Sequence, residues 1–302
     1  MSHTSAKWKK DLVPWLFLAP SLGGVAVFMG FPFLDVLKRS FMDTMGTRFV
    51  GTKNYQAVLG NSAFRLAAGN TMWFLTVCIP LLMMVSLGLA LLLSDCAEKN
   101  KNSVVIASCR AILVLPMAVP TASMVLVWKI ILCQDGLLNQ ILTQITNDTW
   151  EIDWAFSRHA FPVLTITYLW KHTGYDMILW LAGLQGIPRE LYEAAKMDGA
   201  GAGARFCYVT IPGLRKTFGM VGILSMVNSF RVYREAYLLA GTYPDSSIYM
   251  IPHLFAHWFL SLDVQKMTAA AVMMTGIFVI PVVLGRWIII WRGTMKKEQR
   301  KE

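Results

Sequence analysis

Residues 190–214 read ELYEAAKMDGAGAGARFCYVTIPGL, a charged and glycine-rich segment between two long apolar stretches. Pro188 and Glu190 favour the start of a helix, because proline fits the first turn and acids stabilise the positive N-terminal end. The residues up to Gly199 are enough for about two and a half helical turns. Glycine can end that helix in a left-handed conformation, and the small residues 200–204 let the chain turn against another surface. The segment therefore predicts a short, stiff helix that docks on a partner; an ordinary loop is the alternative.

The whole chain has the composition of a protein that crosses a membrane. Its 302 residues are 55% hydrophobic and 15% charged, whereas soluble domains carry roughly a quarter charged residues. Six apolar stretches each reach the roughly 20 residues that cross about 30 Å of hydrocarbon as a helix. These stretches run over residues 13–34, 71–93, 104–132, 161–184, 213–240 and 268–290. We therefore predict an all-α polytopic membrane protein with six transmembrane helices.

This prediction gives the chain an orientation and three parts. The parts are an N-terminal segment 1–12, a membrane domain 13–292 with the docking segment 188–212, and a tail 293–302. An even number of spans places both termini on one side, and the excess of basic residues on that side predicts that it is the cytoplasm. The docking segment then faces the cytoplasm as well.

The basic character of the chain fits membrane lipid rather than nucleic acid. The formal net charge is +10, but the basic residues lie at the ends of apolar stretches and not on an aromatic-interleaved patch. The five cysteines show no CxxC pair, which favours separate buried thiols over disulfides or metal ligands. We expect no metal site and no partner nucleic acid.

A family resemblance begins in the quoted segment. The string EAAKMDGAGAGARFCYVTIP at residues 193–212 resembles the EAA motif of binding-protein-dependent ABC importer permeases, EAA-x3-G-x9-I-x-L-P. The matching positions are Glu193, Ala194, Ala195, Gly199 and Pro212, with Val209 and Ile211 as conservative replacements. The likeness extends from WLFLAPSLGGVAVFMGFPFLDVLKRSF in the first apolar stretch through the fourth stretch. Over this length the chain is similar to the sugar-type (maltose and glycerol-phosphate permease-like) members of the family. It weakens after the fifth stretch, where FRVYREAYLLAGTYP replaces the usual FD and TGGGP-like turn.

The resemblance implies the transmembrane domain of a type I ABC importer in a prokaryotic inner or plasma membrane. It implies a cytoplasmic coupling helix in which Glu193 supplies a charged contact and Ala194 and Ala195 form the close-packed face. The full set of expected coupling residues is Glu193, Ala194, Ala195, Asp198, Gly199 and Pro212. The implied partners are an ABC ATPase dimer, a second permease subunit of different sequence, an extracytoplasmic solute-binding protein and a sugar-like solute.

The chain itself carries no signature of ATP hydrolysis. A P-loop needs the pattern GxxxxGK[ST], and no Gly-Lys pair occurs in the sequence. We therefore expect no cofactor and no catalytic residue in this chain, with ATP and magnesium on a separate ATPase subunit.

Polar residues inside the predicted spans are candidates for a solute pathway, because they are costly in hydrocarbon. In the span 161–184 the spacing of His172 and Asp176 would let them pair across one helical turn. Lys171 lies beside them, and a solvated position at the outer membrane face is the alternative for all three side chains.

The fifth span carries the densest polar group, between Asn228 and Glu235. Aromatic rings beside hydrogen-bonding side chains suit a sugar, and Arg231 or Arg234 would suit an anionic solute. Contact with the partner permease is the alternative role. The expected pathway residues are Trp170, Tyr175, Asp176, Asn228, Arg231 and Tyr233.

Two other classes of membrane protein were weighed. An ion-coupled secondary transporter needs carboxylates within its spans and often an inverted repeat, but Asp176 is the one carboxylate deep in a predicted span and no such repeat is visible. A membrane-bound enzyme would show a nucleophile elbow, an HExxH motif or paired carboxylates. We retain the secondary transporter as the alternative.

Overall fold

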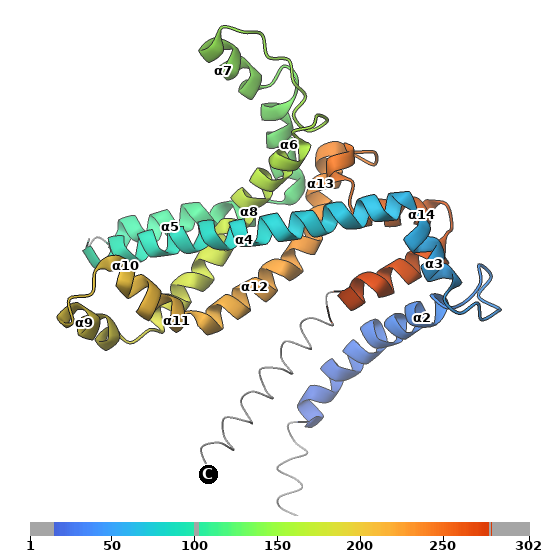
Figure 1. Cartoon of the computed structure of the whole chain (residues 1–302), viewed down its shortest axis with the longest axis horizontal. Coiled ribbons are helices and arrows are strands. Elements are labelled where there is room, and N and C mark those ends of the chain that lie inside the picture. Colours follow the sequence, from blue (N-terminus) through green and yellow to red (C-terminus); the bar gives the residue numbers. More distant parts are fainter. Residues whose placement is uncertain (1–14, 100–102, 278, 280–302) are drawn as a thin grey trace, which may run out of the picture. The chain divides into compact units, whose positions relative to one another are not determined.

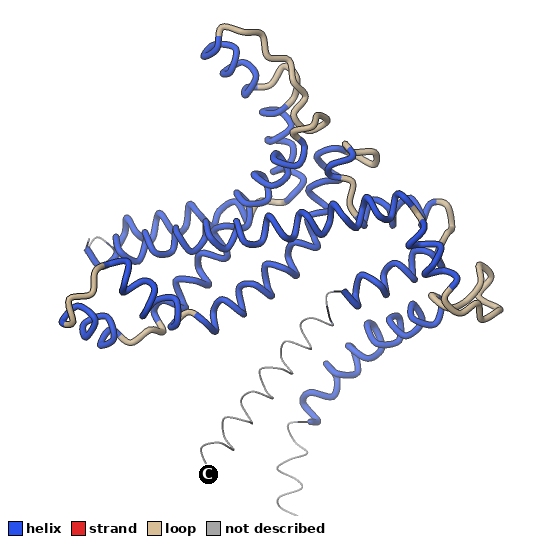
Figure 2. Tube along the Cα trace, in the orientation of Figure 1, coloured by secondary structure: helices blue, strands red, loops and turns tan. Residues whose placement is uncertain are grey.

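The computed structural model describes residues 15–99, 103–277 and 279, and over these residues every regular element is a helix (Figure 2). Three helical segments of the described part are long and apolar enough to cross a membrane: Trp15–Arg39, Ser62–Glu98 and Thr121–Thr146. The predicted all-α membrane class is confirmed at this level, whereas the count of six spans stays a prediction. The segments 1–12 and 293–302, and most of the predicted span 268–290, lie outside the described residues.

The chain forms two compact units. The first contains Met1–Arg65 and Phe255–Glu302. Its elements include a π-helical turn η1 (Ala26–Gly30), α2 (Phe31–Arg39), α3 (Lys53–Gly60) and the last part of α14 (Ile251–Leu260). Pro32, in the first turn of α2, explains the wide π-helical turn η1 before it. Proline has no N–H to donate to the preceding turn, and its ring needs extra space there.

The second unit, Leu66–Leu254, holds most of the described helices (Figure 1). Its long helices are α4 (Ser62–Lys99, which begins in the first unit), α5 (Ser103–Ala118), α6 (Thr121–Leu132), α7 (Leu137–Thr146), α8 (Ala160–Gln185) and α12 (Arg215–Ser229). Its shorter elements are α9 (Arg189–Met197), α10 (Ala202–Arg205), η2 (Phe206–Thr210), α11 (Ile211–Gly213), η3 (Phe230–Val232), α13 (Tyr233–Ala240) and η4 (Ser246–Ile248).

The predicted stretch 104–132 is not one continuous helix. Its helix ends at Ala118, and α6 begins at Thr121 after Pro120. Pro120 has an extended ψ of 136°, and proline also disfavours the helical conformation of Val119 before it. The break leaves the N-terminus of α6 inside the unit. It is the first feature that shapes the candidate site.

Two further predicted stretches of this unit differ in regularity. Residues 161–184 fall within one unbroken helix, α8. The stretch 213–240 becomes α12 and α13 with the 3₁₀ turn η3 between them. A 3₁₀ turn inside a longer helix tightens the backbone and redirects the side chains that follow it, so Tyr233 and Arg234 start a new helix.

Helix α8 is the centre of the second unit. Gly174 faces α5 so closely that a Cβ atom there would collide with the backbone of Leu113 and Val114. Polar side chains tie α8 to its neighbours: Trp180 donates to Ser86 of α4 at 3.0 Å, and Ser225 of α12 donates to Asp176 at 2.6 Å. Three buried apolar clusters surround these contacts, and α8 contributes to each of them.

Candidate functional site

The docking segment forms the helix that its sequence predicts. Helix α9 begins after Pro188, its N-cap, and Glu190 lies in its first turn. Gly199 has φ +74°, the left-handed conformation that glycine adopts without strain. The amide of Ala200 donates to the carbonyl of Ala195 at 2.9 Å, and that of Gly199 donates to Lys196 at 3.1 Å. This pair of bonds is a Schellman motif, which satisfies the last carbonyls and ends the helix firmly.

One face of α9 is free of the rest of its unit. Glu193, Ala194 and Asp198 are exposed, and Ala195 is half-buried. Two large apolar side chains share this exposure, Leu191 at 52% and Met197 at 88%. Leu191 and Met197 thus give this short, otherwise polar helix an apolar part that the rest of its unit leaves exposed.

The opposite face of α9 is anchored to the body of the unit. The hydroxyls of Tyr192 and Thr210 lie 2.9 Å apart, which joins α9 to η2. Leu214 is fully buried, and Gly213 lies so close to Ile187 that a Cβ would overlap its side chain. The exposed Pro212 explains the wide π-helical turn η2 before it, as Pro32 does in the first unit. Packed contacts therefore connect α9 with α8 and α12.

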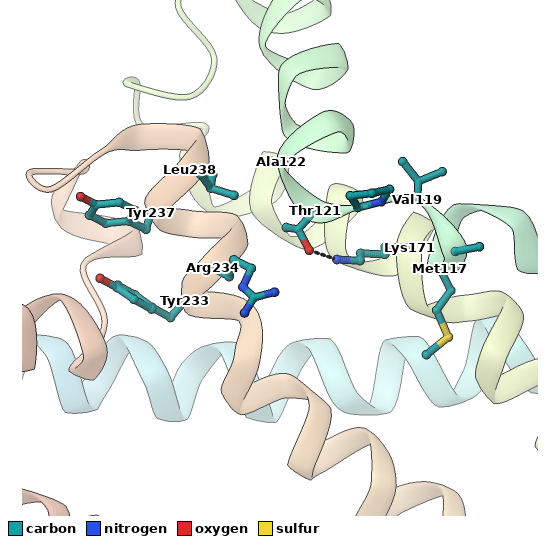
Figure 3. A pocket seen from close by; sticks show the side chains of 11 residues that line it. Met117, Val119, Thr121, Ala122, Lys171, Tyr233, Arg234, Tyr237 and Leu238 are labelled. Atoms are coloured by element: carbon teal, nitrogen blue, oxygen red, sulfur yellow. Dashed lines mark hydrogen bonds between the residues drawn. The ribbon is translucent and has the colours of Figure 1, made fainter.

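A pocket lies where the break between α5 and α6 faces α13 (Figure 3). Its volume is about 780 Å³, within the range of small-molecule sites. Backbone and side chains of residues 117–122 line one side, and Tyr233, Arg234, Tyr237 and Leu238 line the other. Lys171 of α8 completes the lining.

A buried ion pair lies beside this pocket. The Lys171 Nζ donates to Glu235 Oε1 at 2.8 Å and to Thr121 Oγ1 at 2.5 Å. Both charged side chains are buried. In this low-dielectric interior the attraction between unit charges is far stronger than in water, so the pair links α8, α13 and the start of α6.

The aromatic side of the pocket comes from α13. The rings of Tyr233 and Tyr237 lie 5.5 Å apart at 45°, and Tyr233 also contacts His253 edge to face at 5.0 Å. The guanidinium of Arg234 extends from the same helix into the pocket (Figure 3). Rings, hydroxyls and cations in one cavity can hold a polar ring compound by stacking and hydrogen bonds.

The structure separates the predicted pathway residues. Among the five of these residues whose side chains the structure describes, Tyr233 is the one that lines this pocket. Trp170 is half-exposed and stacks edge to face on Trp128 at 5.9 Å, and Tyr175 and Asn228 are half-buried elsewhere. Asp176 is buried and accepts from Ser225, and the side chain of Arg231 lies outside the described residues.

Three interpretations of the charged side chains were wrong. His172 does not pair with Asp176: its ring stacks on Tyr168 at 4.2 Å, and its Nδ1 has no hydrogen-bond partner among the described residues. A solvated outer position is also excluded for Lys171 and Asp176, which are 7% and 1% exposed. Asp176 is not the one deep carboxylate either, since Glu235 is 4% exposed.

The sequence contains signals for the pocket residues that were missed. Pro116 and Pro120 stand four residues apart in a stretch interpreted as one helix, and a proline followed by Thr121 is a helix-start pattern. Three charged residues at or beside the pocket lie in the predicted apolar stretches: Lys171, Arg234 and Glu235. Two of them are cations and one is an anion, which suggests one ion pair and one remaining cation. No local sequence signal shows that Lys171 pairs with Glu235, which lies 64 residues away in the chain.

Comparison with known proteins gives a consistent result. The family described as "Binding-protein-dependent transport system inner membrane component" matches residues 86–290. The lactose transport system permease protein LacF of Rhizobium radiobacter is 32% identical over 239 residues, 78% of each chain. The trehalose/maltose transport system permease protein MalF of Thermococcus litoralis is 32% identical over 247 residues, 80% of this chain and 81% of that one.

The fold also has a counterpart among solved structures. A chain of a bacterial ABC transporter involved in the import of the acidic polysaccharide alginate has a TM-score of 0.78 to this chain at 18% identity. The superposition covers 96% of this chain and 99% of that chain. At this level of identity the likeness concerns the fold alone.

Proposed function

The chain belongs to the family of binding-protein-dependent transport system inner membrane components, and from this premise we propose that it is a permease subunit of an ATP-driven importer. Its solute is a carbohydrate or a related compound, as for the lactose and trehalose/maltose relatives. The chain forms half of the translocation pathway, and an extracytoplasmic binding protein delivers the solute.

The observation that carries this proposal is the exposed and rigidly ended helix α9. Its outer face presents Glu193, Ala194 and the apolar Met197, while Tyr192 holds its inner face to Thr210. In such an arrangement, closure of an ATPase dimer on ATP moves α9 as a lever. The packed contacts of Leu214 and Ile187 pass that movement to α12 and α8. The membrane-spanning helices then change the side to which the pathway opens.

The partners follow from this division of labour. An ABC ATPase dimer binds α9 and carries ATP and magnesium, and a second permease of different sequence forms the other half of the pathway. Both termini and α9 face the cytoplasm, in agreement with the excess of basic residues on that side. The expected coupling residues remain Glu193, Ala194, Ala195, Asp198, Gly199 and Pro212. The pocket beside α6 and α13 is the candidate position of the solute within this subunit.

The coupling role is tested by changing α9 without changing the pocket. Glu193→Lys reverses a charge on the exposed face, and Gly199→Val places a β-branched residue at φ +74°, which costs about 1–3 kcal/mol of local strain. We expect both variants to insert into the membrane and to lose either ATPase binding or the coupling of ATP hydrolysis to uptake. Uptake by the importer in vesicles and co-purification of the ATPase measure the two effects.

A matched control lies four residues beyond Gly199. Gly203 has no positive φ, and a Cβ there would meet nothing within 4 Å, so Gly203→Ala should retain normal uptake and normal ATPase binding. Uptake at the level of the unmodified protein in both Glu193→Lys and Gly199→Val would mean that α9 is a loop helix without a coupling role.

An ion-coupled secondary transporter remains the second candidate, because the structure adds a buried carboxylate to Asp176. Glu235, however, is already neutralised by Lys171 at 2.8 Å, which makes it a poor carrier of a coupling ion. Vesicles that contain the complete importer distinguish the two mechanisms. Uptake driven by a proton or sodium gradient in the absence of ATP would exclude the ATP-driven importer.

A further inference from the structure

The pocket beside α6 carries more positive charge than a neutral sugar needs. Two of its lining side chains, Lys171 and Arg234, are cationic, and none of the described residues that line it is acidic. The nearby carboxylate of Glu235 bonds to Lys171 and leaves Arg234 without an ion pair among the described residues. The balance of charge in the pocket is therefore positive.

Among the described residues of this site, Arg234 is the free cation. Its side chain is exposed, lines the pocket, and donates no hydrogen bond to any acceptor within the described part of the chain. Figure 3 shows the guanidinium extending from α13 into the space that Thr121 and Lys171 border on the other side. A guanidinium presents its donors as a planar fork, which matches the two oxygens of a carboxylate or phosphate.

Lys171 has capacity for one more acceptor. An ammonium group carries three N–H donors, and two of them are used by Glu235 and Thr121. The third is available to a ligand on the pocket side. Because two hydrogen bonds already hold the ammonium group in place, ligand binding to the third donor does not have to order the Lys171 side chain.

The start of α6 adds a third attraction for an anion. Pro120 is its N-cap, no side chain caps its first turn, and residues 120–122 line the pocket. The first N–H groups of a helix lack carbonyl partners within it, and they carry the positive end of the helix dipole. In membrane transporters, interrupted helices present such N-termini to anionic groups of the solute.

We propose that this pocket binds an acidic sugar, with its carboxylate or phosphate between Arg234, Lys171 and the N-terminus of α6. The sugar ring lies beside Tyr233 and Tyr237, which also line the pocket. The inference rests on the proposed function, because it assigns the chemical class of the solute that the importer carries.

The test measures ligand protection of a cysteine placed in the pocket. Ala122 lines the pocket and is exposed, so Ala122→Cys reports occupancy when the exposed Cys96, Cys109, Cys133 and Cys207 are replaced by serine. The complete importer in lipid vesicles is treated with N-ethylmaleimide, which carries no charge. The probes are glucose, glucuronate and glucose 6-phosphate, which differ in the group at C6.

We expect glucuronate or glucose 6-phosphate to slow the labelling at concentrations about tenfold below those that glucose needs, since a charge-assisted contact contributes at least this factor. Arg234→Gln should remove that difference, and Arg234→Lys should restore part of it. Arg215→Gln is the matched control, because this arginine is exposed on α12 and does not line the pocket. Equal protection by glucose and both anions, or no protection by any probe, would overturn the inference.

A second measurement separates this inference from the proposed function. The same vesicles are offered short galacturonate oligomers and galactose oligomers of equal length, with and without ATP. ATP-driven uptake of galactose oligomers alone would retain the importer and overturn the acidic solute. Absence of ATP-driven uptake for both, with anion protection intact, would count against the importer and leave the acidic-sugar site supported.

Discussion

Lys171 and Glu235 lie 64 residues apart in the chain and form a buried ion pair at 2.8 Å. Their burial gives the pair two opposing contributions: the loss of hydration is costly, and the attraction in the interior offsets it. The hydroxyl of Thr121 bonds the same ammonium, whereas Oε2 of Glu235 has no partner among the described residues. The pair therefore specifies which helices meet more than it adds to net stability.

This balance predicts different effects for single and double substitutions. Lys171→Met or Glu235→Leu leaves one buried charge without its partner, and we expect a loss of about 3–5 kcal/mol in stability. The double variant Lys171→Met/Glu235→Leu should recover most of that loss. Thermal unfolding of the purified protein in detergent measures both.

The exposed pair Arg39–Asp35, at 2.6 Å and about half-exposed, is the control. Asp35→Asn should change the stability by less than about 1 kcal/mol, because water screens exposed pairs. Additive losses in the double variant of Lys171 and Glu235 would contradict a direct interaction between them.

Helices α5 and α8 approach each other closely, and glycine permits it. Gly174 places the α8 backbone against Leu113 and Val114 without a side chain between them. Small residues at such positions let membrane helices gain contact over long stretches. The same contact fixes the C-terminal end of α5, where the break before α6 opens the pocket.

A methyl group at this contact should separate the two helices. We expect Gly174→Ala to destabilise the protein by about 1–3 kcal/mol, as for overpacked interiors. Gly219→Ala in α12 is the matched control, since a Cβ there meets nothing within 4 Å. That change should be neutral or stabilise by about 0.5–1 kcal/mol through helix propensity. Equal thermal unfolding of both variants would show that α5 and α8 do not meet at Gly174.

At the scale of the whole molecule, orientation in the membrane decides whether α9 can meet an ATPase. The excess of basic residues predicts that α9 and both termini are cytoplasmic, with the loop after α7 on the outer side. Cys207 follows α9 and is exposed, and Cys78 is buried. Native thiols therefore provide both a reporter and an internal control.

Labelling of intact cells with a membrane-impermeant maleimide tests the orientation. In a chain that keeps Cys78 and Cys207 as its cysteines, we expect labelling of Cys207 only after the membrane is opened. Asp148→Cys, made in a chain without Cys207, lies just after α7 and should react in intact cells. Labelling of Cys207 in intact cells would place α9 outside and would exclude its contact with a cytoplasmic ATPase.

Local sequence patterns were sufficient to predict the helical class and the helix α9. Apolar stretches predict helices because a helix satisfies its own backbone groups, and the glycine at position 199 ends α9 because it alone adopts φ +74° without strain. The motif around Glu193 identified the family for the same reason: all its positions lie within one short segment.

Only the tertiary structure decided the pocket and its chemistry. Its lining comes from α5, α6, α8 and α13, and the sequence carries no signal for which of several charges pair across such separations. The break at Pro120 is local, but its meaning depends on what faces it. Because Lys171 already pairs with Glu235, Arg234 and the uncapped N-terminus of α6 remain available to a ligand. Long-range packing, which chooses among partners of equal local suitability, makes that decision.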